Sequence, residues 1–296
     1  MQTNILMFLL YSLISVITVY TIPGKGKKYA LLAFNILFYL LCDARFLILM
    51  LLGIGWSFHY GKIVSRNKNK LTLIVGIIPI IGILCFFKYY NFFIPESKDI
   101  LQITMPLGIS YYTFKIISYI VDSCHGKNED GIEWIDYTNY ISFFPQIICG
   151  PISRPKDFLG QISNLQKNLK NPVKEEGILL IISGLFKKLV IADRLGNYVN
   201  SIFDNYERYP ALALWMAAFF YTIQIYCDFA GYSEIVIGIC NLFGIECKPN
   251  FALPYFSYSI RDFWGKWHIS LSSWLRDYVY IPLGGNRKGK KRKIIN

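Results

Sequence analysis

One histidine near the end of the sequence stands among residues that could support proton transfer. His268 lies in the string FWGKWHISLSSWLRD, close to Trp264, Trp267 and Trp274. Histidine is the side chain best suited to moving protons near neutral pH. Ionisable groups in an otherwise apolar chain are functional candidates when they are paired or face a cavity. The alternative is an interfacial histidine that only forms hydrogen bonds, with the tryptophans in an aromatic belt.

The pattern around this histidine predicts one helix over residues 260–276. Ser259 and Asp262 resemble the start of a capping box. On a helical wheel, an arc of about 120° holds the apolar residues Ile260, Phe263, Trp264, Trp267, Leu271, Trp274 and Leu275. His268 falls at the edge of this stripe, with Ser272 on the polar side. We therefore expect the imidazole to be reachable by substrate but shielded from bulk water.

The composition predicts a membrane protein. Of the 296 residues, 54% are hydrophobic and 17% charged, and the mean hydropathy is +0.36. Soluble domains usually have about a quarter of charged residues. Uncharged runs at 4–22, 71–87 and 211–226 each approach the roughly 20 residues that cross a bilayer as a helix. The predicted fold is all-α and polytopic, with a first span that lacks the features of a cleaved signal peptide.

The basic residues indicate an orientation in the membrane. The net charge is +12, and basic residues gather in short segments at 25–28, 62–70 and 287–293. The positive-inside rule places these segments in the cytoplasm and the N-terminus outside, and it disfavours a nucleic-acid partner. Residues 29–42 and 46–60 are then expected to form an out-and-back pair. Both are short for full spans, so the pair is predicted to be thin or partly interfacial.

The middle of the chain is less regular. Residues 105–122 and 141–155 are apolar but contain proline and glycine. Irregular backbone at membrane depth is tolerated only where protein surrounds it or a water-filled cavity lies beside it. These segments are predicted to be re-entrant or horizontal pieces around a central cavity, with interfacial loops as an equal alternative. The polar residues 156–175 are expected on the membrane surface.

A single integral domain, residues 1–296, is predicted because no repeat or linker is visible, with N-terminal spans in 1–100 and a core in 101–296. Lys187 and Lys188 interrupt an apolar run over 177–194, which predicts a tilted or half-inserted helix with lysines that snorkel to the interface. The seven cysteines show no C-x-x-C spacing. They are expected to be small core residues, and no metal site is predicted.

Long strings of the sequence resemble the membrane-bound O-acyltransferase family. The most specific is FWGKWHISLSSWLRDYVYIPLGGNRKG. The others, in chain order, are MPLGISYYTFKIISYIVD, FFPQIICGPISRPKDF, GLFKKLVIAD and YCDFAGYSEIVIGICNLFGI. Together they cover roughly residues 100–293. The resemblance is to the bacterial branch that contains alginate O-acetylation proteins and the D-alanine transfer protein of teichoic acids, with the alginate type closer.

The resemblance implies a multi-pass enzyme of the bacterial cytoplasmic membrane. Such an enzyme transfers an acyl group, by default acetyl, from a cytoplasmic thioester (acetyl-CoA or an acyl carrier) to hydroxyls of an exported polysaccharide or a carrier. It binds no cofactor, sits in the lipid bilayer and works with an extracytoplasmic acyltransferase partner. By the same match His268 is an active-site residue. Residues expected to line the cavity or position substrate are Asp228, Trp264, Trp267, Ser272, Arg276 and Asp277. The last two are expected to form a structural ion pair or part of the cavity wall.

The sequence departs from the family pattern in one respect. A second histidine, taken as the catalytic base, is expected in a Leu-Trp-His-Gly context after the basic loop, and the sequence contains no such string. His59 and His125 stand in other contexts. We therefore expect a C-terminally truncated chain with weak or no turnover alone. The competing hypothesis is a non-catalytic membrane scaffold or polysaccharide export component, which has no physical reason to carry the W-H-I-S-L-S string.

Overall fold

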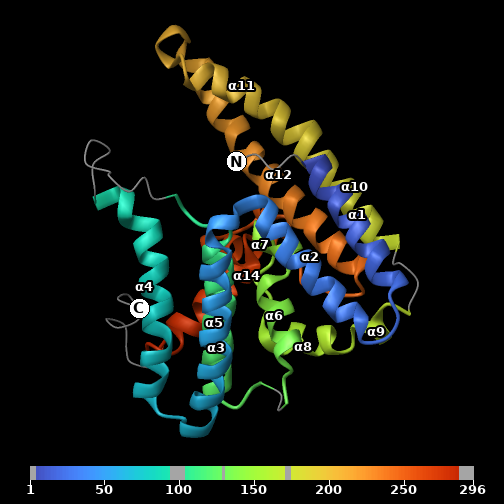
Figure 1. Cartoon of the computed structure of the whole chain (residues 1–296). Helices are drawn as coiled ribbons and strands as arrows, with labels where there is room; N and C mark the ends of the chain where they lie inside the picture. The colour runs from blue at the N-terminus through green and yellow to red at the C-terminus, as the bar shows by residue number, and fades with distance from the viewer. Residues whose placement is uncertain (1–4, 94–103, 129–130, 171–174, 287–296) are drawn as a thin grey trace. The chain divides into compact units, whose positions relative to one another are not determined.

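The computed structural model describes residues 5–93, 104–128, 131–170 and 175–286 (Figure 1). Within these ranges the regular elements are helices and there is no β-strand, so the all-α prediction is confirmed. The basic run at 287–293 lies outside the described residues. The chain divides into two compact units, unit 1 (1–148, 152–171 and 273–296) and unit 2 (149–151 and 172–272). The prediction of a single integral domain stays a prediction.

Unit 1 contains most of the N-terminal helices. They are α1 (Ile5–Thr21), α2 (Gly26–Asp43), η1 (Ala44–Phe46), α3 (Leu47–Asn67), α4 (Lys70–Phe93), α5 (Ile109–Cys124), α6 (Trp134–Ser142), α7 (Phe144–Ile147), α8 (Pro155–Ser163) and α9 (Leu165–Asn168). The unit also holds the π-helical turn η6 (Arg276–Tyr280) near the C-terminus. The polar segment 156–175 thus carries α8 and α9, and its residues 171–174 are not described.

Three stretches of the described chain are long and apolar enough to cross a membrane: Gly26–Asn67, Lys70–Tyr90 and Ala211–Leu242. The first contains the expected pair of helices, and Figure 1 shows the chain reversing at η1. α2 has 18 residues and α3 has 21, which is about 27 and 32 Å of helix. Both helices extend past the apolar runs that predicted them, but the added residues include Lys27, Lys28, Lys62 and Arg66. The expectation of a thin or partly interfacial pair stays a prediction.

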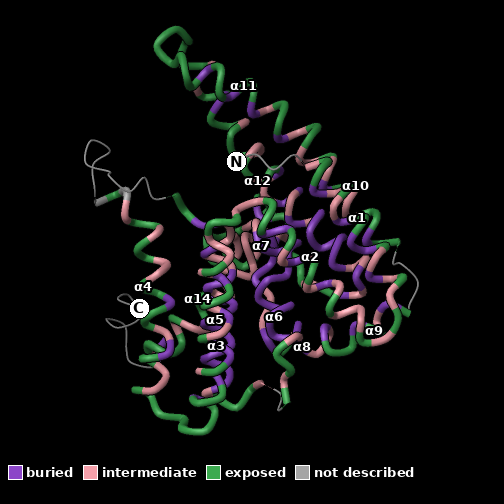
Figure 2. Tube along the Cα trace, viewed as in Figure 1, coloured by how far each residue is buried: buried purple, intermediate pink, exposed green. Residues whose placement is uncertain are grey.

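The segment 105–122 is more regular than predicted. It forms the continuous helix α5, which starts after Gly108 in the left-handed region (φ 67°). Most of α5 is buried, as Figure 2 shows by its colour. Lys115 is 2% exposed and donates a hydrogen bond to the carbonyl oxygen of Tyr140 at 3.0 Å. The alternative of an interfacial loop was wrong for residues 109–122, because they form one continuous helix. A re-entrant or horizontal placement of this helix in the membrane stays a prediction.

The segment 141–155 is broken, as predicted. α6 ends at Ser142, α7 lasts four residues, and residues 148–154 are not helical before α8 begins at Pro155. Residues 141–147 are buried, so this stretch is not a surface loop. The prolines explain the break, because each lacks a backbone N–H and cannot continue a helix interior.

Unit 2 is built on two antiparallel helices. Its elements are α10 (Glu175–Leu185), the π-helical η3 (Phe186–Ala192), α11 (Asp193–Phe203), η4 (Tyr206–Arg208), α12 (Ala211–Leu242), η5 (Pro254–Phe256) and α13 (Ile260–Lys266). The last helix, α14 (Ile269–Leu275), begins in this unit and returns the chain to unit 1.

Glycines bring the backbones of α10 and α12 into contact. A Cβ on Gly184 would lie 2.4 Å from the carbonyl oxygen of Gly231, and a Cβ on Gly238 would lie 2.5 Å from that of Gly177. The two glycines on each helix are seven residues apart, about two turns. They therefore face the same way, and their missing side chains allow a close helix–helix contact that larger residues would prevent.

Candidate active site around His268

The predicted helix over 260–276 is interrupted at its centre. α13 ends at Lys266 and α14 begins at Ile269, so the prediction of one continuous helix was wrong. His268 stands at the break with φ 42°, in the left-handed region. Such a conformation is uncommon for residues other than glycine and is found where the surrounding structure enforces it.

The start of α13 matches its prediction. The hydroxyl of Ser259 accepts a hydrogen bond from the backbone N–H of Asp262 at 3.1 Å. The carboxylate of Asp262 accepts one in return from the backbone N–H of Tyr258 at 3.2 Å. Local spacing was enough to predict this end, because both partners lie within one turn.

Asn250 supports the break from a distant part of the chain. Its carbonyl oxygen accepts a hydrogen bond from the N–H of Ile269 at 2.9 Å, and its side-chain Oδ1 accepts from the N–H of Ser270 at 3.3 Å. Asn250 is 1% exposed. It therefore caps α14 from outside the helix and holds the backbone next to His268. Sequence reasoning missed this residue, since nothing in its local context signals a cap 19 positions away.

The imidazole of His268 lies in a mostly apolar setting. Its ring meets the ring of Phe229 edge-on, with centroids 4.8 Å apart. Nδ1 is buried and has no hydrogen-bond partner among the described residues. Burial lowers the pKa of His268 to about 4. The ring is therefore neutral at pH 7, and its buried Nδ1 is left unpaired among the described residues.

Aromatic rings surround Trp267, the neighbour of His268. The rings of Trp267 and Phe263 stack with centroids 5.5 Å apart, and Phe251 meets Trp267 edge-on at 5.1 Å. The hydroxyl of Ser272 donates to the carbonyl oxygen of Trp267 at 3.2 Å. Trp264, by contrast, is 53% exposed. The break at His268 thus divides the predicted apolar stripe, and its residues do not form one buried face.

Two lysines of unit 2 are paired with acids on α12. Lys188 Nζ lies 2.6 Å from Asp228 Oδ1 and 2.8 Å from Asp193 Oδ1. Lys187 forms an ion pair with Glu234. Acids on neighbouring helices therefore neutralise both lysines. The expectation of a tilted or half-inserted helix with snorkelling lysines stays a prediction. Asp228 is paired, as expected of an acid in an apolar run, and its role in substrate binding stays a prediction.

Arg276 and Asp277 belong to unit 1 and form part of a polar network there. Their side chains contact each other at 2.8 Å, and Asp277 also accepts a hydrogen bond from Arg154 Nη2 at 3.2 Å. The guanidinium of Arg154 lies over the ring of Tyr278, 4.5 Å from its centroid. Tyr278 in turn donates to Asp122 at 2.8 Å. The ion pair agrees with the structural role expected for Arg276 and Asp277, and sequence reasoning missed Arg154.

The remaining histidines and cysteines lie elsewhere. His125 Nδ1 contacts the carbonyl oxygen of Val121 at 2.8 Å, and the ring of His59 lies near Trp134 in unit 1. Cys227 and Cys240 are buried as expected, but Cys85 is exposed and the others are half-buried. In the described part of the chain, no three His, Cys, Asp or Glu residues are grouped so that they could hold a metal ion.

Comparisons with known proteins give the sequence similarities of this chain. The sequence pattern of the membrane-bound O-acyltransferase family matches residues 3–296. A probable alginate O-acetylase AlgI of Pseudomonas putida is 35% identical, over 97% of this chain and 62% of the relative. A peptidoglycan O-acetyltransferase of Helicobacter pylori is 32% identical, over 90% and 57%. A teichoic acid D-alanyltransferase of Bacillus subtilis is 32% identical, over 59% and 45%. The chain spans about half to three-fifths of the length of these curated relatives.

Proposed function

This chain belongs to the membrane-bound O-acyltransferase family, and from that premise we propose that it transfers an acetyl group from a cytoplasmic thioester to hydroxyls of an exported polysaccharide. The family makes it an acyltransferase with several apolar helices. Acetyl is favoured because the O-acetylase of Pseudomonas putida and the O-acetyltransferase of Helicobacter pylori match over 97% and 90% of the chain, whereas two teichoic acid D-alanyltransferases match over 59% and 77%. The donor, the acceptor and the partner are parts of this proposal.

The observation that carries the proposal is the state of His268. Its backbone is held at positive φ beside the cap from Asn250, and its Nδ1 is buried without a partner among the described residues. An enforced backbone conformation together with an unused buried nitrogen costs stability. A histidine with only a structural role needs neither the enforced backbone nor the unused nitrogen. A histidine that orients a ligand benefits from both features.

The reaction itself is nucleophilic acyl transfer. The oxygen of the acceptor hydroxyl attacks the thioester carbonyl carbon, a C–O bond forms, and the C–S bond breaks. The hydroxyl proton passes to a base and ends on the sulfur of the departing thiol. Because the pKa of His268 is about 4, this imidazole is a weak base and better suited to accept a hydrogen bond. We propose that it orients a substrate hydroxyl, while the base is the second histidine that the resemblance implies in longer relatives.

The surroundings of the reaction are also part of the proposal. Apolar packing around His268 excludes water that would otherwise hydrolyse the thioester. The basic segments at 25–28 and 62–70 support a cytoplasmic donor side by the positive-inside rule. The bacterial cytoplasmic membrane, an outside N-terminus and an extracytoplasmic acyltransferase partner complete the proposed arrangement, and they rest on the resemblance.

The test is transfer of labelled acetyl from a thioester to glycan in membranes that contain the complete gene product. His268→Ala is expected to lower transfer by about 100-fold, because a misplacement of about 1 Å at the reacting hydroxyl can cost that much in rate. His125→Ala is the matched control, because His125 contacts only a backbone carbonyl at the end of α5. Both variants should insert in the membrane equally. Transfer retained in His268→Ala would contradict the assignment, and glycan export without any transfer would favour the non-catalytic alternative.

A further inference from the structure

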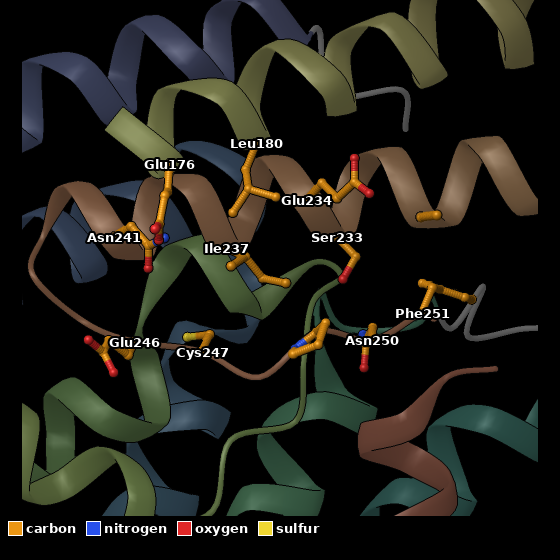
Figure 3. Close-up of a pocket in the computed structure, with 12 residues that line it drawn as sticks. Glu176, Leu180, Ser233, Glu234, Ile237, Asn241, Glu246, Cys247, Asn250 and Phe251 are labelled. Atoms are coloured by element: carbon orange, nitrogen blue, oxygen red, sulfur yellow. The ribbon is translucent and has the colours of Figure 1, made fainter. Parts of the chain in front are cut away.

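Unit 2 contains a cavity that the reaction scheme above does not use. It measures about 400 Å³, is open on one side, and is lined by residues of α10, α12 and the segment 246–251 (Figure 3). That volume lies within the range of small-ligand sites in proteins. Its polar lining residues are Glu176, Ser233, Glu234, Asn241, Glu246 and Asn250. The remaining lining is mostly apolar, and it includes the ring of Phe251 at the end nearest Asn250.

Two of these polar residues are fully buried and carry an unused hydrogen-bonding group. Ser233 and Asn250 are each 1% exposed. Ser233 Oγ and Asn250 Nδ2 have no hydrogen-bond partner among the described residues. In Figure 3 the Ser233 oxygen points from α12 toward the segment that carries Asn250. Buried polar atoms are nearly always paired in proteins, so two unpaired groups on one cavity indicate a place where a ligand supplies the partner.

The charges of the lining restrict the chemistry of that ligand. Three lining residues are glutamates, and none is Lys, Arg or His. The ion pair with Lys187 neutralises Glu234, while the acidic side chain of Glu176 adds negative charge. Such a lining opposes the phosphates of a coenzyme thioester and the carboxylates of a uronic acid. The carboxylates can accept hydrogen bonds from hydroxyl groups, and the unpaired groups of Ser233 and Asn250 can bind a neutral oxygen. Together with the aromatic ring, this lining suits an uncharged sugar.

The cavity and His268 share a wall. Phe251 lines the cavity, and its ring meets that of Phe229 edge-on at 5.0 Å. The other contact of Phe229 is with the imidazole of His268 at 4.8 Å. Asn250 lines the cavity with its unused amide group and caps the first turn after His268 with its oxygens. The rings of Phe251 and Phe229 therefore lie between a ligand in the cavity and the imidazole of His268.

We infer that this cavity binds an uncharged segment of the glycan acceptor, with Ser233 Oγ and Asn250 Nδ2 as its hydrogen-bonding anchors. Its role as the acceptor site rests on the proposed function, whereas binding itself does not. The inference selects one class of acceptor. It favours neutral sugars, such as N-acetylated hexosamines, over polymers of uronic acids.

The test is binding of two oligosaccharides to the purified chain in detergent, measured by calorimetry. One is the neutral tetramer of β-1,4-linked N-acetylglucosamine, and the other is tetramannuronate, which is anionic. We expect the neutral tetramer to bind at least about tenfold more tightly, because the anion meets the glutamates. Ser233→Ala should weaken binding of the neutral tetramer about three- to tenfold, the usual effect of one hydrogen bond. Ser201→Ala, at an exposed position on α11, should leave the affinity unchanged.

Two variants separate an effect on ligand binding from an effect on folding. Ser233 Oγ has no partner among the described residues, so Ser233→Ala should keep or raise the melting temperature while it weakens binding. Asn250→Asp is the second variant, since it keeps the Oδ1 that caps α14 and removes the amide donor. Its binding is measured per folded molecule, because a carboxylate at this buried position lowers stability.

The outcomes also separate this inference from the proposed function. Equal affinity for the two tetramers, or unchanged affinity in both Ser233→Ala and Asn250→Asp, would overturn the inference. If the complete gene product acetylates uronates while the neutral tetramer does not bind, the inference fails and acetyl transfer stands. If the neutral tetramer binds through Ser233 but no acetyl is transferred to any glycan, the site stands and the proposed function fails.

Discussion

Buried asparagines are used in opposite ways in the two units. In unit 1, Asn35 donates to Asn139 Oδ1 at 2.9 Å and accepts from the backbone N–H of Phe144 at 3.0 Å. Asn139 in turn donates to the carbonyl oxygens of Lys28 and Ile135. In unit 2, Asn250 uses its acceptor and leaves its donor unpaired. Complete pairing stabilises a fold, and a group left over in a cavity is available to a ligand.

Lysines show a related difference. Lys115 of unit 1 is almost fully buried, donates to a backbone carbonyl and lies over the rings of Tyr140 and Phe158. In unit 2, Lys187 and Lys188 pair with carboxylates on partly exposed surfaces. Polar groups in unit 1 thus join helices within a packed interior. The polar groups of unit 2 lie beside the glycine contact between α10 and α12 and beside the cavity. Some of them are left unpaired there.

The largest expected effect is the loss of acetyl transfer in Asn250→Ala, which tests the contrast between the two buried asparagines. The substitution removes the Oδ1 that accepts from Ser270, so the backbone beside His268 loses a support. A misplacement of about 1 Å at a catalytic group can cost about 100-fold in rate. We expect a loss of that order in acetyl transfer by the complete gene product, measured per folded molecule.

Asn35→Ala is the matched control in unit 1. It leaves the N–H of Phe144 and the Oδ1 of Asn139 without their partner, and it should lower the free energy of unfolding by about 1–3 kcal/mol. Its transfer rate per folded molecule should be that of the wild type. If Asn35→Ala lowered that rate as much as Asn250→Ala, the proposed division between a supporting and a functional asparagine would be wrong.

A smaller effect on stability is expected from Gly231→Ala. The new Cβ would lie 2.7 Å from the carbonyl oxygen of Gly184, so α10 and α12 would have to separate. Overpacking of this kind costs about 1–3 kcal/mol. The melting temperature should fall, measured in detergent by circular dichroism. Gly265→Ala is the control, because nothing lies within 4 Å of its Cβ, and a melting temperature lowered equally in both would exclude the close contact as the cause.

A further effect, confined to acidic pH, is a pH dependence that comes from His268. Burial lowers its pKa from 6.5 to about 4, so the unfolded chain binds more protons than the folded chain between these values. Stability is therefore lost as the pH falls from about 6.5 toward 4. His268→Gln removes this contribution and should flatten the stability profile in that window, measured by urea unfolding at each pH. Identical slopes for the wild type and His268→Gln would show that the imidazole is not buried.

Much of this molecule follows from local patterns in the sequence. Apolar runs predicted the membrane class and the helix pair 29–42 and 46–60, because hydropathy is a property of each segment. Ser259 and Asp262 predicted the start of α13, because a cap and its partner lie within one turn. The strings around His268 predicted the family that residues 3–296 match.

Tertiary structure decided the features that depend on distant partners. A helical wheel treats 260–276 as one helix, but Asn250 caps it from another segment and the chain breaks at His268. The pairs of Lys187 and Lys188 with Glu234 and Asp228 join residues some 40 positions apart. Side-chain periodicity reports which face of an element is apolar, and it carries no information on which polar group faces it across the fold. Local patterns in the sequence therefore specify the family and the membrane class of this protein. Which polar groups are paired and which are left for a ligand depends on the folded chain.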